Sequence, residues 1–243
     1  MLLEIKKLRV APVDNKEALS EVNLQIKQGE VQALLGPNAS GKSTLAQVIL
    51  GNPKYRVNQG KIFFNGKEIT KLAPEKRVKL GLSLAWQSAP TIKGVKLSQL
   101  LEKINKGKIE KGELKIAASN LLSRDVNLNF SGGEKKISEL LQVLALKPKL
   151  VIFDEIDSGL DLKKIEFVSK IIKKELINKK VSILLITHSG EILNFLKPKI
   201  TNVMVRGRII CKEKDFTKVL KTIKKYGYEK CKKCLSEGKL LAN

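Results

Sequence analysis

The chain has 243 residues, enough for one large domain or two small ones, and its hydrophobic content of 42% is ordinary for a globular protein. No segment approaches the roughly 18 consecutive apolar residues of a membrane-spanning helix, and the first residues lack the pattern of a secretory signal. Three cysteines, an odd number, argue against a disulfide framework. We therefore expect a cytoplasmic protein with no direct membrane insertion.

The net charge of +23 raises the question of an acidic partner. Clustered lysines would favour nucleic acid, because they release counterions from phosphates. The lysines of this chain are instead spread along its whole length and often alternate with glutamate. This distribution favours a solvated surface, leaves an acidic protein as the first alternative partner, and makes nucleic acid the weakest alternative.

The N-terminal part of the chain is predicted to be mostly β. Apolar runs at residues 3–10 and 22–36 predict strands. After a glycine-rich loop, apolar residues at helical spacing predict a helix that ends near Gly51. Residues 61–69 predict a hairpin with an Asn-Gly turn, and residues 81–86 a short buried strand.

The glycine-rich loop matches the pattern G-x-x-x-x-G-K-[ST], with the strand before it and the helix after it that a phosphate-binding loop requires. Backbone N–H groups of such a loop surround phosphate oxygens, and the helix N-terminus adds positive potential. We expect Lys42 to reach the terminal phosphates and Ser43 to bind Mg²⁺. The predicted nucleotide-binding residues of the loop are Gly36, Pro37, Asn38, Ala39, Ser40, Gly41, Lys42, Ser43 and Thr44.

Residues 88–130 differ from their surroundings, since they are polar and lysine-rich and predict helices joined by loops. Beyond them the chain alternates between helices and apolar strands, which predicts an α/β layered sheet interrupted by a helical insertion. We expect a single domain over residues 1–226, an inserted helical subdomain at about 88–146 and a short tail over 227–243.

The stretch "LVIFDEIDSGLD" ends a predicted buried strand in several acids. Asp154 stands at the carboxyl end of that strand, where it can supply the negative anchor for a metal ion bound near the phosphates. Glu155, on the opposite side of the pleat, is placed to polarise an attacking water molecule. The alternatives are a solvated loop and a calcium loop. A calcium loop needs acids or Asn at alternate positions followed by Gly, and that spacing is absent.

The stretch "SGGE" predicts the start of a helix. Ser131 and Glu134 form a capping box, and the residues expected on the buried side of the helix are Ile137, Leu140, Leu141 and Leu144. Gly132 and Gly133 leave backbone N–H groups uncovered and available to an anion. Because Lys42 already has its own loop, we expect this second site to cover a nucleotide held by another copy of the protein.

The only histidine, His188, directly follows the apolar run "VSILLIT". A lone histidine is more often structural than catalytic, but its place after a buried strand in a chain with a phosphate loop favours contact with a γ-phosphate. Gln87 ends an earlier strand just before the helical insertion. It is the weaker candidate, because most glutamines are surface residues.

These motifs, in this order, resemble the ATP-binding cassette (ABC) ATPases over nearly the whole chain. The resemblance implies a Mg²⁺-dependent ATPase that dimerises transiently, head to tail, on two ATP molecules. In such a dimer Ser131, Gly132 and Gly133 face the γ-phosphate held by Lys42 of the other copy, and Asp161 lies in a loop between the two sites. It also implies the catalytic set Glu155, His188 and Gln87, and the metal-binding set Ser43, Gln87 and Asp154.

The stretches "FSGGEKKISELLQ", "FDEIDSGLDLKKI" and "QSAPTIKGV" are similar to the SufC-type ATPases of iron–sulfur cluster assembly. That resemblance implies SufB- and SufD-type scaffold proteins as partners, which ATP-driven closure would deform. The alternatives are an ATP-binding subunit of an ABC transporter and, more weakly, a nucleic-acid-associated ABC ATPase.

The chain departs from the family pattern at several positions. Ile137 replaces a usual Arg, and Ala39 replaces a frequent Gly at a position that we expect to tolerate a side chain. No aromatic residue near positions 10–16 is available to stack on adenine. The tail carries Cys231 and Cys234, only half of a tetrahedral metal site. We expect reduced thiols there unless two chains share the pair or Cys211 joins it.

Overall fold

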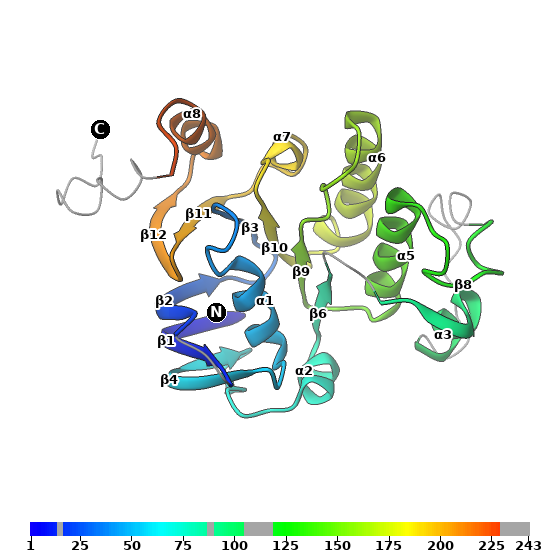
Figure 1. The fold of residues 1–243 in the computed structure, drawn as a ribbon, viewed down its shortest axis with the longest axis horizontal. Helices are drawn as coiled ribbons and strands as arrows, with labels where there is room; N and C mark the ends of the chain where they lie inside the picture. Colours follow the sequence, from blue (N-terminus) through cyan, green and yellow to red (C-terminus); the bar gives the residue numbers. More distant parts are fainter. Residues whose placement is uncertain (14–16, 87–89, 105–118, 229–243) are drawn as a thin grey trace.

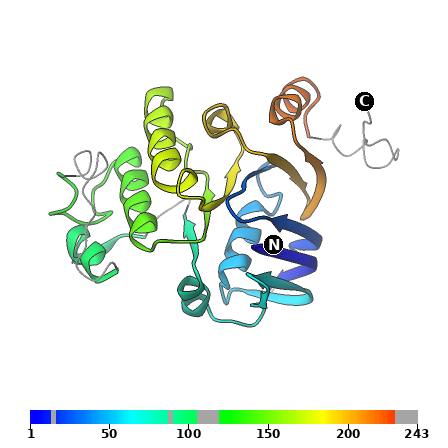
Figure 2. The same ribbon diagram turned by 180° about the vertical axis from the view of Figure 1, so that it is seen from behind.

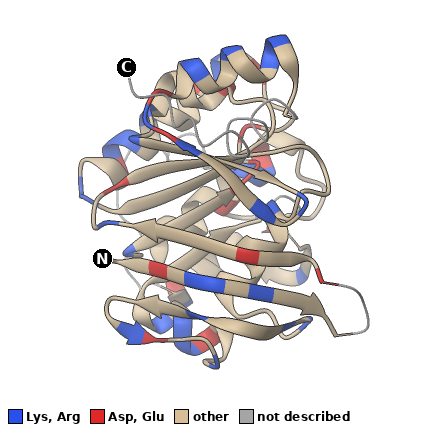
Figure 3. Ribbon diagram, turned by 90° about the vertical axis from the view of Figure 1, so that its left-hand side faces the viewer, with Lys and Arg blue, Asp and Glu red and all other residues tan. Residues whose placement is uncertain are grey.

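The computed structural model describes residues 1–13, 17–86, 90–104 and 119–228, which form two larger sheets, a small two-stranded sheet and the helices around them (Figures 1 and 2). Among these residues, no helix combines the length and the apolar character needed to cross a bilayer. Lysine and arginine lie on strands and helices across the face drawn in Figure 3, with acids between them, and several follow one another along the last helix.

The first sheet is antiparallel, with the strand order β2-β1-β4-β5. Its strands are β1 (Leu3–Pro12), β2 (Leu19–Ile26), β4 (Tyr55–Phe64) and β5 (Lys67–Glu68). In β2 buried and exposed residues largely alternate, as expected for a strand with one face against a core. The predicted hairpin at residues 61–69 is confirmed by the pairing of β4 with β5.

The second sheet has six strands in the order β12-β11-β3-β10-β9-β6. Its strands are β3 (Val31–Leu35), β6 (Leu82–Ala85), β9 (Leu150–Asp154), β10 (Ser182–Thr187), β11 (Ile200–Val205) and β12 (Arg208–Glu213). Strands β3, β9 and β10 are buried along their whole length, because both faces of a parallel sheet are covered. Only β12 is antiparallel to its neighbour.

The sheet separates two hydrophobic cores, since neighbouring residues of one strand point into different cores. In β9, Val151 and Phe153 belong to one core and Leu150 and Ile152 to the other. Figure 1 shows α1 between the two larger sheets and α5 to α8 on the opposite side of the six-stranded sheet. The helices on these two sides are α1 (Lys42–Leu50), α2 (Pro74–Leu80), α5 (Gly132–Ala145), α6 (Leu162–Ile172), α7 (Glu191–Leu196) and α8 (Phe216–Tyr226).

The region predicted as helices with loops contains a helix, α3 (Leu97–Ile104), but also a strand pair, so that prediction was partly wrong. Strand β7 (Ile92–Lys96) pairs antiparallel with the short strand β8 (Asp125–Val126). The partner strand lies about thirty residues further along the chain, so local periodicity could not reveal the pairing. Further along the chain, a π-helical turn, η1 (Lys173–Ile177), directly follows α6.

Candidate active site

The phosphate loop joins β3 to α1 and packs against the end of β11 and the turn between β11 and β12. A Cβ atom on Gly36 would lie 2.3 Å from the carbonyl oxygen of Met204, so no side chain fits there. Gly41, at the start of α1, has φ 104°, a left-handed conformation that glycine adopts without strain. The N–H of Gly207 donates to the carbonyl of Ser40 at 2.8 Å, which fixes the loop against the sheet.

Ala39 adopts a backbone conformation that the sequence did not predict. Its φ is 60°, in the left-handed region that favours glycine. An L-residue in this region costs about 1–2 kcal/mol, because its Cβ approaches the carbonyl oxygen. The loop accommodates a side chain at this position, but with a small backbone strain.

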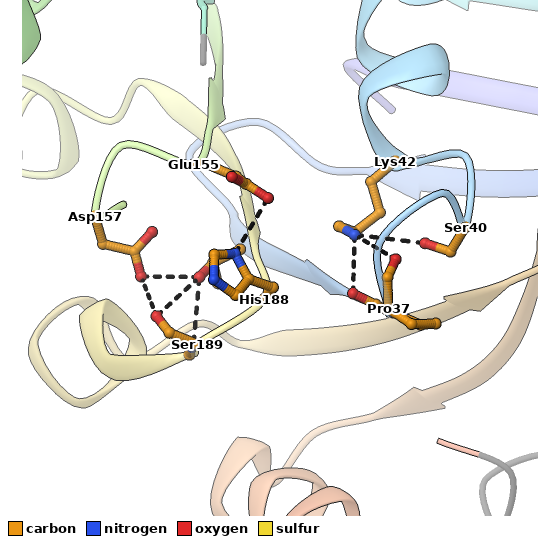
Figure 4. A network of polar contacts seen from close by, with 10 residues as sticks. Pro37, Ser40, Lys42, Glu155, Asp157, His188 and Ser189 are labelled. Carbon is orange, nitrogen blue, oxygen red and sulfur yellow. Dashed lines mark hydrogen bonds and ion pairs between the residues drawn. The ribbon is translucent and has the colours of Figure 1, made fainter. Parts of the chain in front are cut away.

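Lys42 is the first residue of α1 and its side chain turns back into the loop (Figure 4). Its ammonium donates to the carbonyls of Gly36 at 2.8 Å and Pro37 at 2.9 Å. Burial lowers the pKa of Lys42, and the carboxylates of Glu155 and Asp154 oppose that shift. The loop thus holds a buried cation within electrostatic range of Asp154, which ends β9, and of Glu155, which follows it.

Asp154, the last residue of β9, is buried beside the start of α1. Burial raises the pKa of the Asp154 carboxyl, and the nearby Ser43 hydroxyl opposes that shift. Its Oδ1 is buried and has no hydrogen-bond partner among the described residues. An unsatisfied carboxylate oxygen beside a hydroxyl fits Mg²⁺, which prefers oxygen ligands and takes the rest from water and phosphate.

The described residues contain no group of three or more His, Cys, Asp or Glu side chains that could hold a metal ion. A Mg²⁺ ion held by Ser43 and Asp154 would need further ligands, which water and a bound nucleotide can supply. Gln87, the other predicted metal contact, lies outside the described residues, as do Cys231 and Cys234.

Glu155 follows β9 in a turn, with φ 57°, and its N–H donates to the carbonyl of Ile186 in β10 at 2.8 Å. Its carboxylate Oε1 lies 3.2 Å from Nδ1 of His188, which directly follows β10 (Figure 4). The Glu155 side chain is 9% exposed and the imidazole 47% exposed. The imidazole of His188 is therefore accessible to solvent, whereas the carboxylate of Glu155 is buried beneath it.

Asp157 is the acid whose role the sequence did not reveal. It is buried, and its Oδ2 accepts hydrogen bonds from the hydroxyls of Thr187 and Ser189, both at 2.8 Å. These two residues flank His188, so Asp157 ties the turn after β9 to the turn after β10 (Figure 4). The sequence offered one indication of this role: Thr187 and Ser189 carry hydroxyl groups at the end of a buried strand, and buried hydroxyl groups need a hydrogen-bond acceptor.

Asp161 is exposed and forms the N-cap of α6. Its Oδ1 accepts from the backbone N–H of Lys164 at 2.9 Å, and the Lys164 ammonium lies 3.0 Å from the same carboxylate. These hydrogen bonds lower the pKa of Asp161. A Cβ on Gly133 would lie 3.7 Å from the side chains of Leu160 and Lys164, so the "SGG" segment and the loop of Asp161 are neighbours.

The predicted capping box of α5 is confirmed. Ser131 Oγ accepts from the N–H of Glu134 at 3.3 Å, and Glu134 accepts from the N–H of Ser131 at 2.7 Å. Arg124, which the sequence reading missed, binds the other Glu134 oxygen at 2.9 Å and stacks 4.4 Å from the ring centre of Phe130. A Cβ on Gly132 would meet nothing within 4 Å, so this face of the helix start is open.

The buried side of α5 is more polar than predicted. Leu140 and Leu141 are buried, but Ile137 and Leu144 are only partly so. The buried polar residues of the helix are Lys136, Ser138 and Glu139. Burial lowers the pKa of Lys136, opposed by a set of nearby carboxylates: Glu139, Asp154, Glu155 and Asp157. This helix therefore brings a cation toward the acids of the active site.

Comparisons with known proteins agree on one family. The family described as "ABC transporter" matches residues 19–158. A probable ABC transporter ATP-binding protein of Streptococcus pyogenes is 39% identical over 225 residues, which cover 86% of this chain and 87% of the relative. A probable ATP-dependent transporter, ycf16, of Antithamnion sp. is 40% identical over 247 residues, 94% of this chain and 97% of the relative.

The same fold occurs in a dimeric structure of the ATP-binding cassette MJ0796 bound to ADP and Pi. It superposes with a TM-score of 0.71 at 19% identity and covers 88% of this chain and 98% of that one. The predicted fold, an α/β phosphate-loop core with a mostly β N-terminal part, is confirmed.

The pH dependence of stability tests the buried carboxyl of Glu139. Burial raises its pKa from 4.5 to about 7. The folded protein therefore binds a proton that the unfolded chain has released between these pH values, so stability is present below pH 4.5 and lost as the pH rises through 7. Relative to Glu139→Gln, we expect urea unfolding of the wild type to lose about 3 kcal/mol between pH 4.5 and 8. Parallel pH profiles for the two proteins would contradict the assignment.

Proposed function

The chain belongs to the ABC transporter family of ATPases, and from that premise we propose that two copies close head to tail on two ATP molecules and thereby move a partner protein. Binding of nucleotide and hydrolysis of ATP come with the family. The residues that perform these steps, the metal ion, the dimer and the partner are the proposal. One observation supports it above all: Lys42, Asp154 and the Glu155–His188 pair meet at the carboxyl ends of three adjacent parallel strands.

In the proposed site, the loop from Gly36 to Thr44 holds the phosphates through its N–H groups, and the Lys42 ammonium exchanges loop carbonyls for phosphate oxygens. Ser43 and Asp154 hold Mg²⁺, with Gln87 as a further contact; when bound, the ion neutralises charge that develops on the phosphates. The buried Asp154 carboxylate supports this role, because it has an oxygen without a hydrogen-bond partner among the described residues.

Glu155 is proposed as the group that receives a proton from the attacking water. The water oxygen bonds to the γ-phosphorus while the bond from that phosphorus to the β–γ bridging oxygen breaks, giving ADP and phosphate. His188, 3.2 Å from Glu155, is placed to contact the γ-phosphate. Asp157 keeps His188 in position through Thr187 and Ser189.

The second copy supplies what one copy lacks. The open N–H groups at Ser131, Gly132 and Gly133 form an anion-binding helix start, and we propose that they cover the γ-phosphate held by Lys42 of the partner copy. Asp161, beside Gly133, would then lie between the two sites. MJ0796 is dimeric in its structure with ADP and Pi, which supports this arrangement.

Two partners are candidates. The names of the relatives favour a membrane transporter, for which this chain would be the ATP-binding subunit. The stretches "FSGGEKKISELLQ" and "FDEIDSGLDLKKI" instead favour a SufB- or SufD-type scaffold for iron–sulfur cluster assembly. In either case we propose docking on the subdomain over residues 88–146, where Ile92 on β7 is an exposed apolar side chain.

Glu155→Gln should abolish hydrolysis but retain ATP binding. Because the amide cannot accept a proton, we expect turnover to fall by a factor on the order of 10² or more. Lys42→Ala is the matched variant and should lose ATP affinity itself. Steady-state turnover and equilibrium binding of a fluorescent ATP analogue check both. Near-wild-type turnover of Glu155→Gln, or unchanged affinity of Lys42→Ala, would contradict the roles given to these residues.

The partner can be identified by isolating tagged Glu155→Gln with ATP and Mg²⁺ from its native cells, with cytoplasm and membranes processed separately. Lys42→Ala is the control, because it should not reach the ATP-bound state. ATP-dependent recovery of a polytopic membrane protein establishes the transporter subunit. Recovery of a soluble SufB- or SufD-like scaffold establishes cluster assembly. Recovery of neither, or of the same proteins with Lys42→Ala, would contradict an ATP-gated partner.

A further inference from the structure

Strand β4, in the first sheet, has an unpaired edge over most of its length (Figure 1). On one side it pairs with β1 from Tyr55 to Phe64, but on the other side β5 and the residues after it cover only Ile62 to Phe64 among the described residues. A cavity of about 700 Å³ lies beside the remaining edge and is lined by residues 57–61 in succession. Because successive residues of a strand point to opposite faces of a sheet, a cavity that touches each of them runs along the edge of the strand.

The other wall of the cavity is formed by residues 70–74 and the end of α1, and Arg77 joins these two segments. The Arg77 side chain is buried, with the residue 3% exposed. Its guanidinium donates to the carbonyls of Val48 and Ile49 in the last turn of α1, both at 2.9 Å. It also donates to two carbonyls within residues 70–74, both at 2.8 Å. The wall that faces the strand edge is therefore held in place before any partner binds.

The surroundings of the cavity are positively charged. Lys61 and Lys71 line it, and the only acid among its described lining residues is Glu68. A hydrogen bond from Lys61 and the nearby charge of Lys71 lower the pKa of Glu68, so these three groups carry one excess positive charge. Burial lowers the pKa of Arg77 to about 10, which leaves its guanidinium charged at neutral pH. The cavity therefore favours an anionic occupant over a neutral or cationic one.

We propose that the edge of β4 binds an extended, acidic segment of a partner protein, which adds to the first sheet as a further strand. The unpaired N–H and C=O groups of an edge strand can form backbone hydrogen bonds with such a segment, and the lysines select its charge. Lysine on an edge strand discourages pairing with a second copy of this basic chain, so the partner is one of opposite charge. This surface is separate from the nucleotide site, because it lies at the last turn of α1 and the phosphate loop precedes the first.

The test uses two fluorescein-labelled peptides of equal length, one that alternates valine with glutamate and one that alternates valine with lysine. Their binding to the full chain is measured by fluorescence polarisation at about 0.15 M salt, where distant charges are screened. We expect the glutamate peptide to bind at least about 10-fold more tightly than the lysine peptide. Lys71→Glu should weaken its binding about 5-fold. Lys221→Glu, the same change of charge at an exposed position of α8, is the control and should alter binding by less than about 2-fold.

Hydrogen exchange of the complex locates the bound peptide. Strand addition predicts slower exchange of backbone amides within residues 56–61 and unchanged exchange in α8. Lys42→Ala should still bind the peptide, because Lys42 lies at the other end of α1 from the cavity. The proposal is overturned if the glutamate peptide does not bind, binds no better than the lysine peptide, or responds equally to Lys71→Glu and Lys221→Glu. Binding without slower exchange at residues 56–61 would indicate a site for small anions and would also overturn strand addition.

Discussion

The parallel pairing of β3, β10 and β9 is the constraint on which the site depends. In this register Leu35 lies opposite Thr187, and Ile186 lies opposite Asp154. Each strand therefore ends at the same edge of the sheet, where the phosphate loop, His188 and the acids follow. A shift of one residue in either pairing would turn the alternating side chains of a strand toward the wrong core. The packing of two cores thus fixes the geometry of the polar groups.

The site is built at a cost in stability. Lys42, Lys136 and Asp154 are all buried. Burial lowers the pKa of both lysines and raises the pKa of Asp154, so it favours the neutral form of each group. Buried charges of this kind are tolerated when they are paired, and are then a weak source of stability. Opposite charges on α1, α5 and the end of β9 compensate one another here. An anionic nucleotide with a divalent cation would enter a field that already contains both signs.

The sequence predicted what local patterns encode. The phosphate loop, the capping box at Ser131 and the acid at the end of β9 each follow from a short motif with a physical reason. Contacts between distant segments were missed, such as Asp157 with the residues around His188, and Glu139 with Trp86. The left-handed φ of Ala39 was missed for another reason. Alanine disfavours this conformation but does not forbid it, so the residue type gave no indication of the backbone angle.

The most direct test of the shared site is the mass of the protein in solution. Glu155→Gln with ATP and Mg²⁺ should have twice the mass of one chain by analytical ultracentrifugation. Adding Gly132→Asp should return it to the mass of one chain while ATP binding is retained, because the space at Gly132 accepts a side chain but the carboxylate repels the partner's γ-phosphate. Dimers that form equally well with Gly132→Asp would contradict a nucleotide covered by the start of α5.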